Sequence, residues 1–305
     1  WMGPEGGQFA IFFRKGAPFD LQNWQTPAFI DTEKYRVVNR TDTEVQFEHQ
    51  AEVENYSGTV FQLKIERTVR LLGRDRVRKQ LGPEVESLQI VAFESENRVF
   101  NTGRAPWVEE KGLLSIWILG MYNPTPETTI VIPFREGPEE DLGPIVNDAY
   151  FGKIPPDRLR IGKGVLFFKG DGKSRGRIGI SPERARPFLG SWDAVKQVLT
   201  VVHFNLPVES SRYVNSMWEI QEDPYDGDVV NSYNDGPPEP GAKPLGPFYE
   251  LETSSPALAL EPGKSYTHFH HTVHLSGDLR ALDRAAESIF GVGIEVIESA
   301  FRVQH

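Results

Sequence analysis

The clearest structural signal in the sequence lies in residues 43–71, which read TEVQFEHQAEVENYSGTVFQLKIERTVRL. Apolar and polar residues alternate over residues 43–53 and again over residues 59–71. A period of two places the apolar side chains of a β-strand on one face and the polar ones on the other. The apolar positions are Val45, Phe47, Ala51 and Val53, and then Phe61, Leu63, Ile65, Val69 and Leu71. We therefore predict two strands, each with one face on a hydrophobic core.

Beyond this stretch, the sequence also predicts a protein built mainly of strands. Further strands are expected at residues 7–13, 33–39, 89–100, 113–119, 128–134, 164–169, 196–204, 212–221, 247–253 and 266–275. A helix is expected after Asp278, because apolar residues recur at helical spacing from Leu279 to Ile289 and Gly291 follows as a stop signal. A short strand over 293–298 is expected next. We predict an all-β fold, with residues 1–305 as one large sandwich carrying one short C-terminal helix.

Composition excludes several classes of function. The 305 residues include 33 Lys and Arg against 43 Asp and Glu, a net charge of −10, which argues against nucleic acid as a partner. The absence of cysteine excludes disulfides, a thiolate nucleophile and cysteine-ligated metals. No signal peptide is visible, and no apolar run approaches the ~18 residues of a membrane-spanning helix, so we expect no membrane insertion.

A pair of carboxylates marks the predicted strand 247–253. Glu250 and Glu252 are two positions apart and therefore share one face, with about 7 Å between them along the strand. Such a pair most often belongs to a solvated surface. The alternative is the wall of a site in which a glutamate acts as general base.

Histidines gather on the predicted strand 266–275. Its even-numbered positions are Tyr266, His268, His270, Thr272 and His274. Imidazoles are good metal ligands, but His268 and His274 would stand about 20 Å apart on a straight strand. We therefore expect no metal and no cofactor here, and a polar surface that either faces a sugar or is buried and hydrogen-bonded.

Residues 213–236 are rich in amide, carboxylate and aromatic side chains. Amides and carboxylates satisfy sugar hydroxyls, and aromatic rings stack on the C–H faces of sugars, so this composition is typical of a carbohydrate cleft. The same residue types also form turns. From this segment we select Asn231, Tyr233, Asn234 and Asp235 as candidate ligand contacts, together with Trp117.

The C-terminal third resembles the galactose mutarotase (aldose 1-epimerase) superfamily. The similar residues are YELET at 249–253 and ALALEPGKSYT at 257–267. In that superfamily a Leu-Glu-Thr strand carries the catalytic glutamate, so the resemblance implies that Glu252 is the general base. Residues 1–8, WMGPEGGQ, and 231–238, NSYNDGPP, are similar to an uncharacterised bacterial subfamily, DUF6786. The resemblance implies a β-supersandwich that lacks its first strands, and a periplasmic or extracellular location.

The sequence differs from the superfamily at the residue that acts as the general acid. Mutarotases carry a histidine in an Asn-x-His-x-Tyr-Phe-Asn-Leu segment, and this histidine protonates the ring oxygen of the sugar. The corresponding residues 114–123 read LSIWILGMYN and contain no histidine. We expect His203, or a histidine within 268–274, to take this role beside Glu252.

Three functions remain open from the sequence. The first is an aldose 1-epimerase-like enzyme that acts on a sugar or oligosaccharide. The second is a glycan-binding protein without catalysis, which the missing acid favours. A glycoside hydrolase or polysaccharide lyase ranks lowest, because Glu250 and Glu252 share one strand; a carboxylate such as Asp235 or Glu5 facing Glu252 would raise it. The predicted substrate contacts are Trp117, Asn231, Tyr233, Asn234, Asp235, Glu250, His268 and His270.

Overall fold

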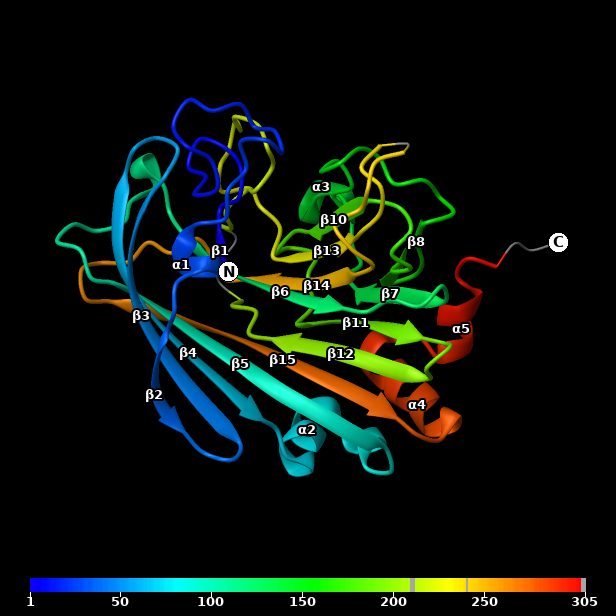
Figure 1. Cartoon of the computed structure of the whole chain (residues 1–305). Helices are drawn as coiled ribbons and strands as arrows, with labels where there is room; N and C mark the ends of the chain where they lie inside the picture. Colours follow the sequence, from blue (N-terminus) through cyan, green and yellow to red (C-terminus); the bar gives the residue numbers. More distant parts are fainter. Residues whose placement is uncertain (209–211, 240, 303–305) are drawn as a thin grey trace.

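The computed structural model describes residues 1–208, 212–239 and 241–302, which form two antiparallel sheets and a few short helices (Figure 1). The ten-stranded sheet has the order β2 (Arg36–Arg40), β3 (Glu44–Glu54), β4 (Val60–Leu71), β5 (Gln89–Asn101), β15 (Ser265–Ser276), β12 (Val198–Phe204), β11 (Phe188–Asp193), β7 (Thr128–Pro133), β9 (Val165–Lys169) and β8 (Leu159–Ile161). The five-stranded sheet has the order β1 (Met2–Gly3), β6 (Ser115–Tyr122), β14 (Tyr249–Ser254), β13 (Val230–Asn234) and β10 (Gly176–Ile180). The predicted all-β class is confirmed.

Strands β3 and β4 form the long hairpin predicted from residues 43–71. Their pairing runs without interruption from Glu44 opposite Arg70 to Glu54 opposite Val60. Gly58 lies in the connecting turn with φ of 89°, a left-handed conformation that favours glycine. The alternating apolar residues at the start of β4 are buried, as the pattern predicts: Phe61, Leu63 and Ile65.

The two sheets stack face to face, and alternate side chains of β14 fill the space between them. The hydroxyl of Tyr249 meets that of Ser191 on β11 at 2.8 Å. Leu251 is fully buried in the cluster that also contains Leu166 of β9. Because neighbouring residues of a strand point to opposite faces, Glu250 and Glu252 point away from the ten-stranded sheet.

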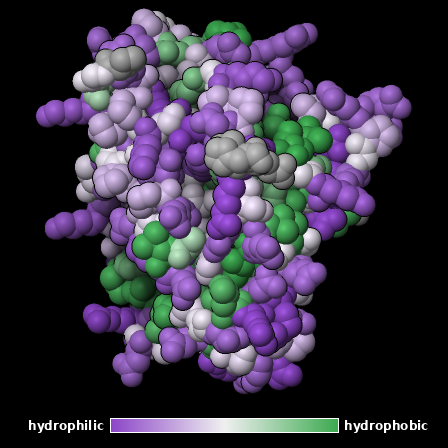
Figure 2. Space-filling model, turned by 90° about the vertical axis from the view of Figure 1, so that its right-hand side faces the viewer, coloured by the Kyte–Doolittle hydropathy of each residue, from purple (hydrophilic) through white to green (hydrophobic). Residues whose placement is uncertain are grey.

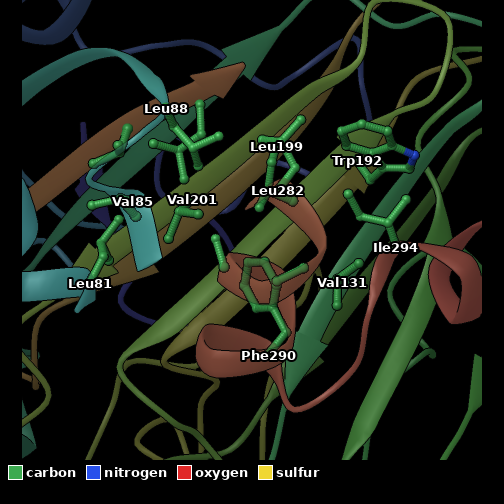
Figure 3. Close-up of a cluster of buried hydrophobic side chains, with 14 of the residues drawn as sticks. Leu81, Val85, Leu88, Val131, Trp192, Leu199, Val201, Leu282, Phe290 and Ile294 are labelled. Carbon is green, nitrogen blue, oxygen red and sulfur yellow. The ribbon is translucent and has the colours of Figure 1, made fainter. Parts of the chain in front are cut away.

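Helices cover the other face of the ten-stranded sheet (Figure 1). They are α2 (Arg74–Leu81), α4 (Leu279–Phe290) and α5 (Ile294–Ser299). Figure 3 shows Leu282 and Phe290 of α4 packed in the cluster that includes Trp192 and Val201. Helix α4 begins where the Asp278 side chain accepts a hydrogen bond from the N–H of Ala281, and it ends at left-handed Gly291. This is the predicted C-terminal helix.

Three local predictions were wrong. The segment predicted as a strand over 293–298 instead contains helix α5 (Ile294–Ser299). Residues 7–13 and 212–221 contain no strand. Their apolar residues lie in irregular turns, where Phe12 and Phe13 are adjacent and both buried. Strands β8, β10, β11 and β13 were not predicted, since they are short and lack a sustained alternation. The remaining short helices are α1 (Ala28–Asp31), α3 (Glu139–Leu142) and 3-10 turns at Pro83–Val85 and Glu109–Lys111.

Helix α5 gives a direct test of this packing. Ile294 is 3% exposed and Val296 is 48% exposed, although in a strand they would share a face. We expect Ile294→Val to lower the free energy of unfolding by about 0.5–1.5 kcal/mol, and Val296→Ala to change it by less than about 0.5 kcal/mol. Urea denaturation of both variants measures this; equal losses would contradict the helix.

The surface in Figure 2 is mostly hydrophilic, with apolar residues in separate groups. None of the described helices is long and apolar enough to cross a membrane.

Candidate functional site

The site face is the face of the five-stranded sheet that points away from the ten-stranded sheet. The register of the strands decides which side chains share it. Glu252 lies opposite Asn231 of β13, and Glu250 lies opposite Tyr233. Tyr233 in turn lies opposite Arg177 of β10. Directly opposed residues project to the same side of an antiparallel pair, so these five side chains share the site face.

The site face is the floor of a cavity of about 430 Å³. The N-terminal segment and residues 213–228 stand together beside it (Figure 1). The N–H of Glu5 donates to the Ser216 hydroxyl at 3.1 Å, and a Cβ on Gly6 would collide with the main chain of Met217. The cavity is lined by Trp1, Glu5, Leu21, Trp24, Trp117, Leu119, Met121, Phe151, Arg175, Arg177, Trp218, Tyr233, Leu245, Phe248, Glu250 and Glu252.

The carboxylate of Glu252 is held by one of its two oxygens. Oε2 accepts hydrogen bonds from the indole Nε1 of Trp117 at 2.8 Å and from Arg177 at 3.0 Å. Oε1 has no hydrogen-bond partner in the described part of the chain, although the residue is only 1% exposed. Glu252 is therefore fixed in orientation, and one of its buried oxygens is left without a hydrogen-bond donor.

Arg177 is the buried cation of the site. It also donates to Glu5 at 3.2 Å, and its guanidinium lies over the rings of Tyr150, at 4.6 Å, and Trp117. Burial alone would lower the pKa of Arg177, but the surrounding acidic groups, Glu252 first, outweigh it and hold the pKa above its ordinary value. Arg177 therefore stays charged and neutralises part of the acidic cluster around it.

Two carboxyl groups near Arg177 have raised pKa values. Burial raises the pKa of Glu5, and the Arg177 charge opposes this only in part. Burial, followed by repulsion from Glu252, raises the pKa of Glu250 well above its ordinary value. Removing a carboxyl from water and placing it near other carboxylates both disfavour its ionised form. The cavity thus combines an oriented Glu252 with two neighbouring carboxyl groups, Glu5 and Glu250, whose pKa values are raised.

The structure brings together only part of the predicted site. Glu252, Glu250, Trp117 and Tyr233 all line the cavity. Asn231 shares their face, and its amide donates to the Tyr150 hydroxyl at 3.3 Å instead of lining the cavity.

Asn234 and Asp235 hold loops instead of lining the cavity. The Asn234 Oδ1 atom accepts from the N–H of Gly172 at 2.8 Å. Asp235 accepts from the Tyr233 hydroxyl and from the N–H of Gly246, both at 2.8 Å. They shape the cavity indirectly, because their hydrogen bonds hold the neighbouring loops and Tyr233 in place.

His268 and His270 lie on the wrong side of β14 to contact a ligand at Glu252. Both rings contact the hydroxyl of Thr253, at 2.9 and 3.0 Å, in the space between the sheets. Burial lowers the pKa of each histidine to about 3, so both are neutral. The alternating pattern located this polar face correctly, but the face is a buried hydrogen-bonded layer.

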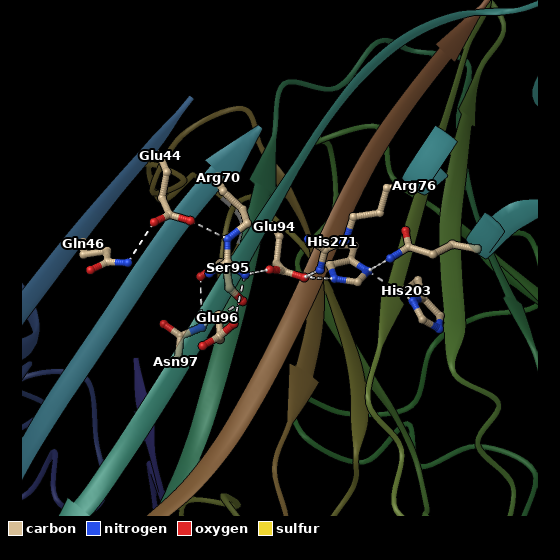
Figure 4. A network of polar contacts seen from close by, with 11 residues as sticks. Glu44, Gln46, Arg70, Arg76, Glu94, Ser95, Glu96, Asn97, His203 and His271 are labelled. Atoms are coloured by element: carbon tan, nitrogen blue, oxygen red, sulfur yellow. Dashed lines mark hydrogen bonds and ion pairs between the residues drawn. The ribbon is translucent and has the colours of Figure 1, made fainter. Parts of the chain in front are cut away.

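His203 is placed still farther from the cavity. Its neighbours on β12, Val202 and Phe204, face the five-stranded sheet, so His203 faces the helix-covered side. There its Nδ1 lies 3.2 Å from the ring of His271, which also contacts Glu94 (Figure 4). Our prediction of His203 as the acid is therefore corrected, because the sheets separate it from Glu252.

The network around Glu94 predicts a pH-dependent stability. Burial raises the Glu94 pKa, but the His271 hydrogen bond and the charges of Arg76 and Arg70 outweigh it and lower the pKa to about 2. An unfolded glutamate titrates near about 4.3, so this stabilisation is complete above that pH and is lost as the pH falls towards 2. We expect Glu94→Gln to cost about 1–3 kcal/mol at pH 7 and less at pH 3, measured by urea denaturation. Glu96→Gln, whose side chain is 39% exposed, should cost under about 1 kcal/mol; equal costs at both pH values for Glu94→Gln would contradict the expectation.

The sequence analysis missed Arg177 and the tryptophans of the N-terminal segment. The available signal was the isolated charge within the otherwise uncharged GRIGI of residues 176–180. Glu5 was considered only as a carboxylate that might face Glu252. It is bound to the same guanidinium as Glu252.

A family of unknown function, DUF6786, matches residues 1–301 of the chain. The chain belongs to this family. A comparison with curated proteins gave no match.

Three solved structures are similar to the DUF6786 protein at low identity. Protein Slr1438 of Synechocystis is 10% identical with a TM-score of 0.49, over 90% of this chain and 76% of its own. A galactose mutarotase-like protein of Lactobacillus casei is 13% identical with a TM-score of 0.46, over 89% and 83%. A galactose mutarotase related enzyme of Lactobacillus acidophilus is 9% identical with a TM-score of 0.43, over 82% and 74%. Likenesses of this degree carry no argument about activity.

Proposed function

We propose that this protein interconverts the anomers of a sugar or oligosaccharide, with Glu252 as general base. The observation that carries the proposal is the buried Oε1 of Glu252, which has no hydrogen-bond partner among the described residues and belongs to a residue on the cavity floor. Buried polar atoms are nearly always paired. A hydroxyl group of a bound ligand would supply the missing donor.

The lining of the cavity suits a sugar. The indoles of Trp24, Trp117 and Trp218 offer apolar faces for the C–H surface of a sugar ring. The charged groups in the lining are Glu5, Glu250, Glu252, Arg175 and Arg177. Carboxyl groups form hydrogen bonds with the hydroxyl groups of a sugar. A volume of about 430 Å³ is in the range of small-ligand sites.

The chemistry needs a proton acceptor at the anomeric hydroxyl. When Glu252 Oε1 takes that proton, the oxygen can form a carbonyl at C1 and the ring bond between C1 and O5 can break. Trp117 and Arg177 hold the other oxygen at 2.8 and 3.0 Å, so the base is oriented before the sugar binds. Positioning a base in this way supports general base catalysis.

Glycan binding without catalysis is the second candidate. It is favoured by the absence of histidine among the residues that line the cavity in the described ranges. The aromatic lining is sufficient for recognition by itself.

Proton NMR separates the two candidates. Freshly dissolved reducing sugars and short oligosaccharides are followed as their anomers equilibrate, with and without the protein. Faster equilibration in proportion to protein concentration supports the epimerase. Broadened ligand signals without faster equilibration would replace it with the binding protein, and no effect on any sugar of the panel would contradict both for those sugars.

A further inference from the structure

Ring opening needs an acid at O5 as well as a base at the anomeric hydroxyl. Histidines are absent from the cavity lining within the described residues, and His203, His268 and His270 lie elsewhere. Besides Glu252, the carboxyl groups of the lining are Glu5 and Glu250.

Glu5 is already engaged through both of its oxygens. Oε1 accepts from the Trp24 indole at 3.0 Å, and Oε2 accepts from Arg177 at 3.2 Å. A proton on Glu5 would sit on an oxygen that already accepts from Trp24 or Arg177. Glu5 therefore serves to hold Arg177 in position.

Glu250 differs from Glu5 in having a free carboxyl group. It lines the cavity, is 7% exposed and forms no side-chain hydrogen bond within the described part of the chain. It stands two residues before Glu252 on β14, about 7 Å along the strand on the same face. Two carboxyl groups at this separation can contact the ring oxygen and the anomeric hydroxyl of one sugar from the same wall.

The surroundings of Glu250 raise its pKa. Burial is the main reason that its pKa lies well above the ordinary value, and repulsion from Glu252 adds to it. Arg177 opposes the shift without cancelling it, because this guanidinium is shared with Glu5 and Glu252. The charged and titratable groups near Glu250 are Glu252 on its own strand, Arg177, Arg175, Tyr233, Glu5 and Asp235.

We propose that Glu250 is the general acid of this site, in place of a histidine; the inference rests on the function proposed above. As Glu252 removes the proton from the anomeric hydroxyl, C1 becomes a carbonyl carbon, the C1–O5 bond breaks, and Glu250 gives its proton to O5. Rotation about C1–C2 and the reverse transfers close the ring as the other anomer. Each carboxyl then returns to its starting state, so no oxidant or other reactant is consumed.

The test measures anomer exchange by two-dimensional exchange NMR with the sugar that exchanges fastest. We expect Glu250→Gln to slow exchange by about 10²–10³-fold, with ligand broadening retained. Glu96→Gln, the same substitution on an exposed side chain of the other sheet, should leave the rate unchanged. Unchanged exchange in Glu250→Gln would overturn the role of Glu250 while leaving the proposed function intact, whereas no exchange with wild type overturns both.

The pH profile of the wild-type protein gives a measurement that needs no variant to fold. Because Glu250 must be protonated, the protein-dependent rate should fall as the pH rises through its raised pKa. This decline should vanish from the residual rate of Glu250→Gln. A decline that persists in Glu250→Gln would assign the titration to another group and overturn the proposal.

Discussion

Glu252→Gln is expected to slow anomer exchange by about 10³–10⁴-fold, the largest effect on activity of any single change. The glutamine amide keeps the shape of the side chain and one oxygen that can accept from Trp117 and Arg177. It cannot accept the proton of the anomeric hydroxyl, because an amide is not a base at neutral pH. The variant should therefore still bind the sugar, which ligand broadening in the NMR spectrum checks.

The matched control for this variant is again Glu96→Gln. It makes the same chemical change on a side chain that is 39% exposed on the opposite sheet. Circular dichroism of both variants confirms that the fold is kept. Exchange at the wild-type rate in folded Glu252→Gln would show that another group acts as base.

Arg177→Met is expected to produce the largest loss of stability, about 3–5 kcal/mol at pH 7. The methionine replaces much of the apolar stem but leaves Glu5 and Glu252 buried without their shared cation. Removing one partner of a buried ion pair is costly because the other charge stays out of water. Urea denaturation measures the loss against Arg212→Met, whose pair with Asp223 is 44% and 45% exposed and should contribute under about 1 kcal/mol.

The same variant should recover stability in acid. Burial holds the pKa values of Glu5 and Glu250 above their ordinary values, and removing the Arg177 charge raises them further. A folded state with raised carboxyl pKa values binds protons more readily than the unfolded chain, so its stability rises as the pH falls. The cost of Arg177→Met should thus be smaller at pH 5 than at pH 7. A cost that is the same at both pH values would show that lost packing, and not charge, is responsible.

The fold was predictable where strands are long and have one polar face. The β3–β4 hairpin shows a period of two, and helix α4 is marked by both of its caps. Strands such as β10 and β13 are short and buried on both faces, so their side chains carry no alternation that a sequence can reveal. Helix α5 was mistaken for a strand because six residues are too few to separate the two periods.

Only the part of the site that lies on a single strand was predictable from the sequence. Glu250 and Glu252 share a face through their spacing alone, whereas Arg177 and Glu5 come from segments that meet them only in the folded chain. The histidines of β15 show a second limit of prediction from the sequence pattern. Both faces of β15 are buried, one against β14 and the other under helices, so the pattern could not tell which polar face meets a ligand.

The most direct test of the central claim is two-dimensional exchange NMR on an equilibrated reducing sugar, with wild type and Glu252→Gln at equal concentrations. If Glu252 is the general base, cross-peaks between the two anomers grow with the concentration of wild type and are absent with Glu252→Gln. Cross-peaks of equal intensity with both proteins, or ligand broadening by both without any cross-peak, would contradict it.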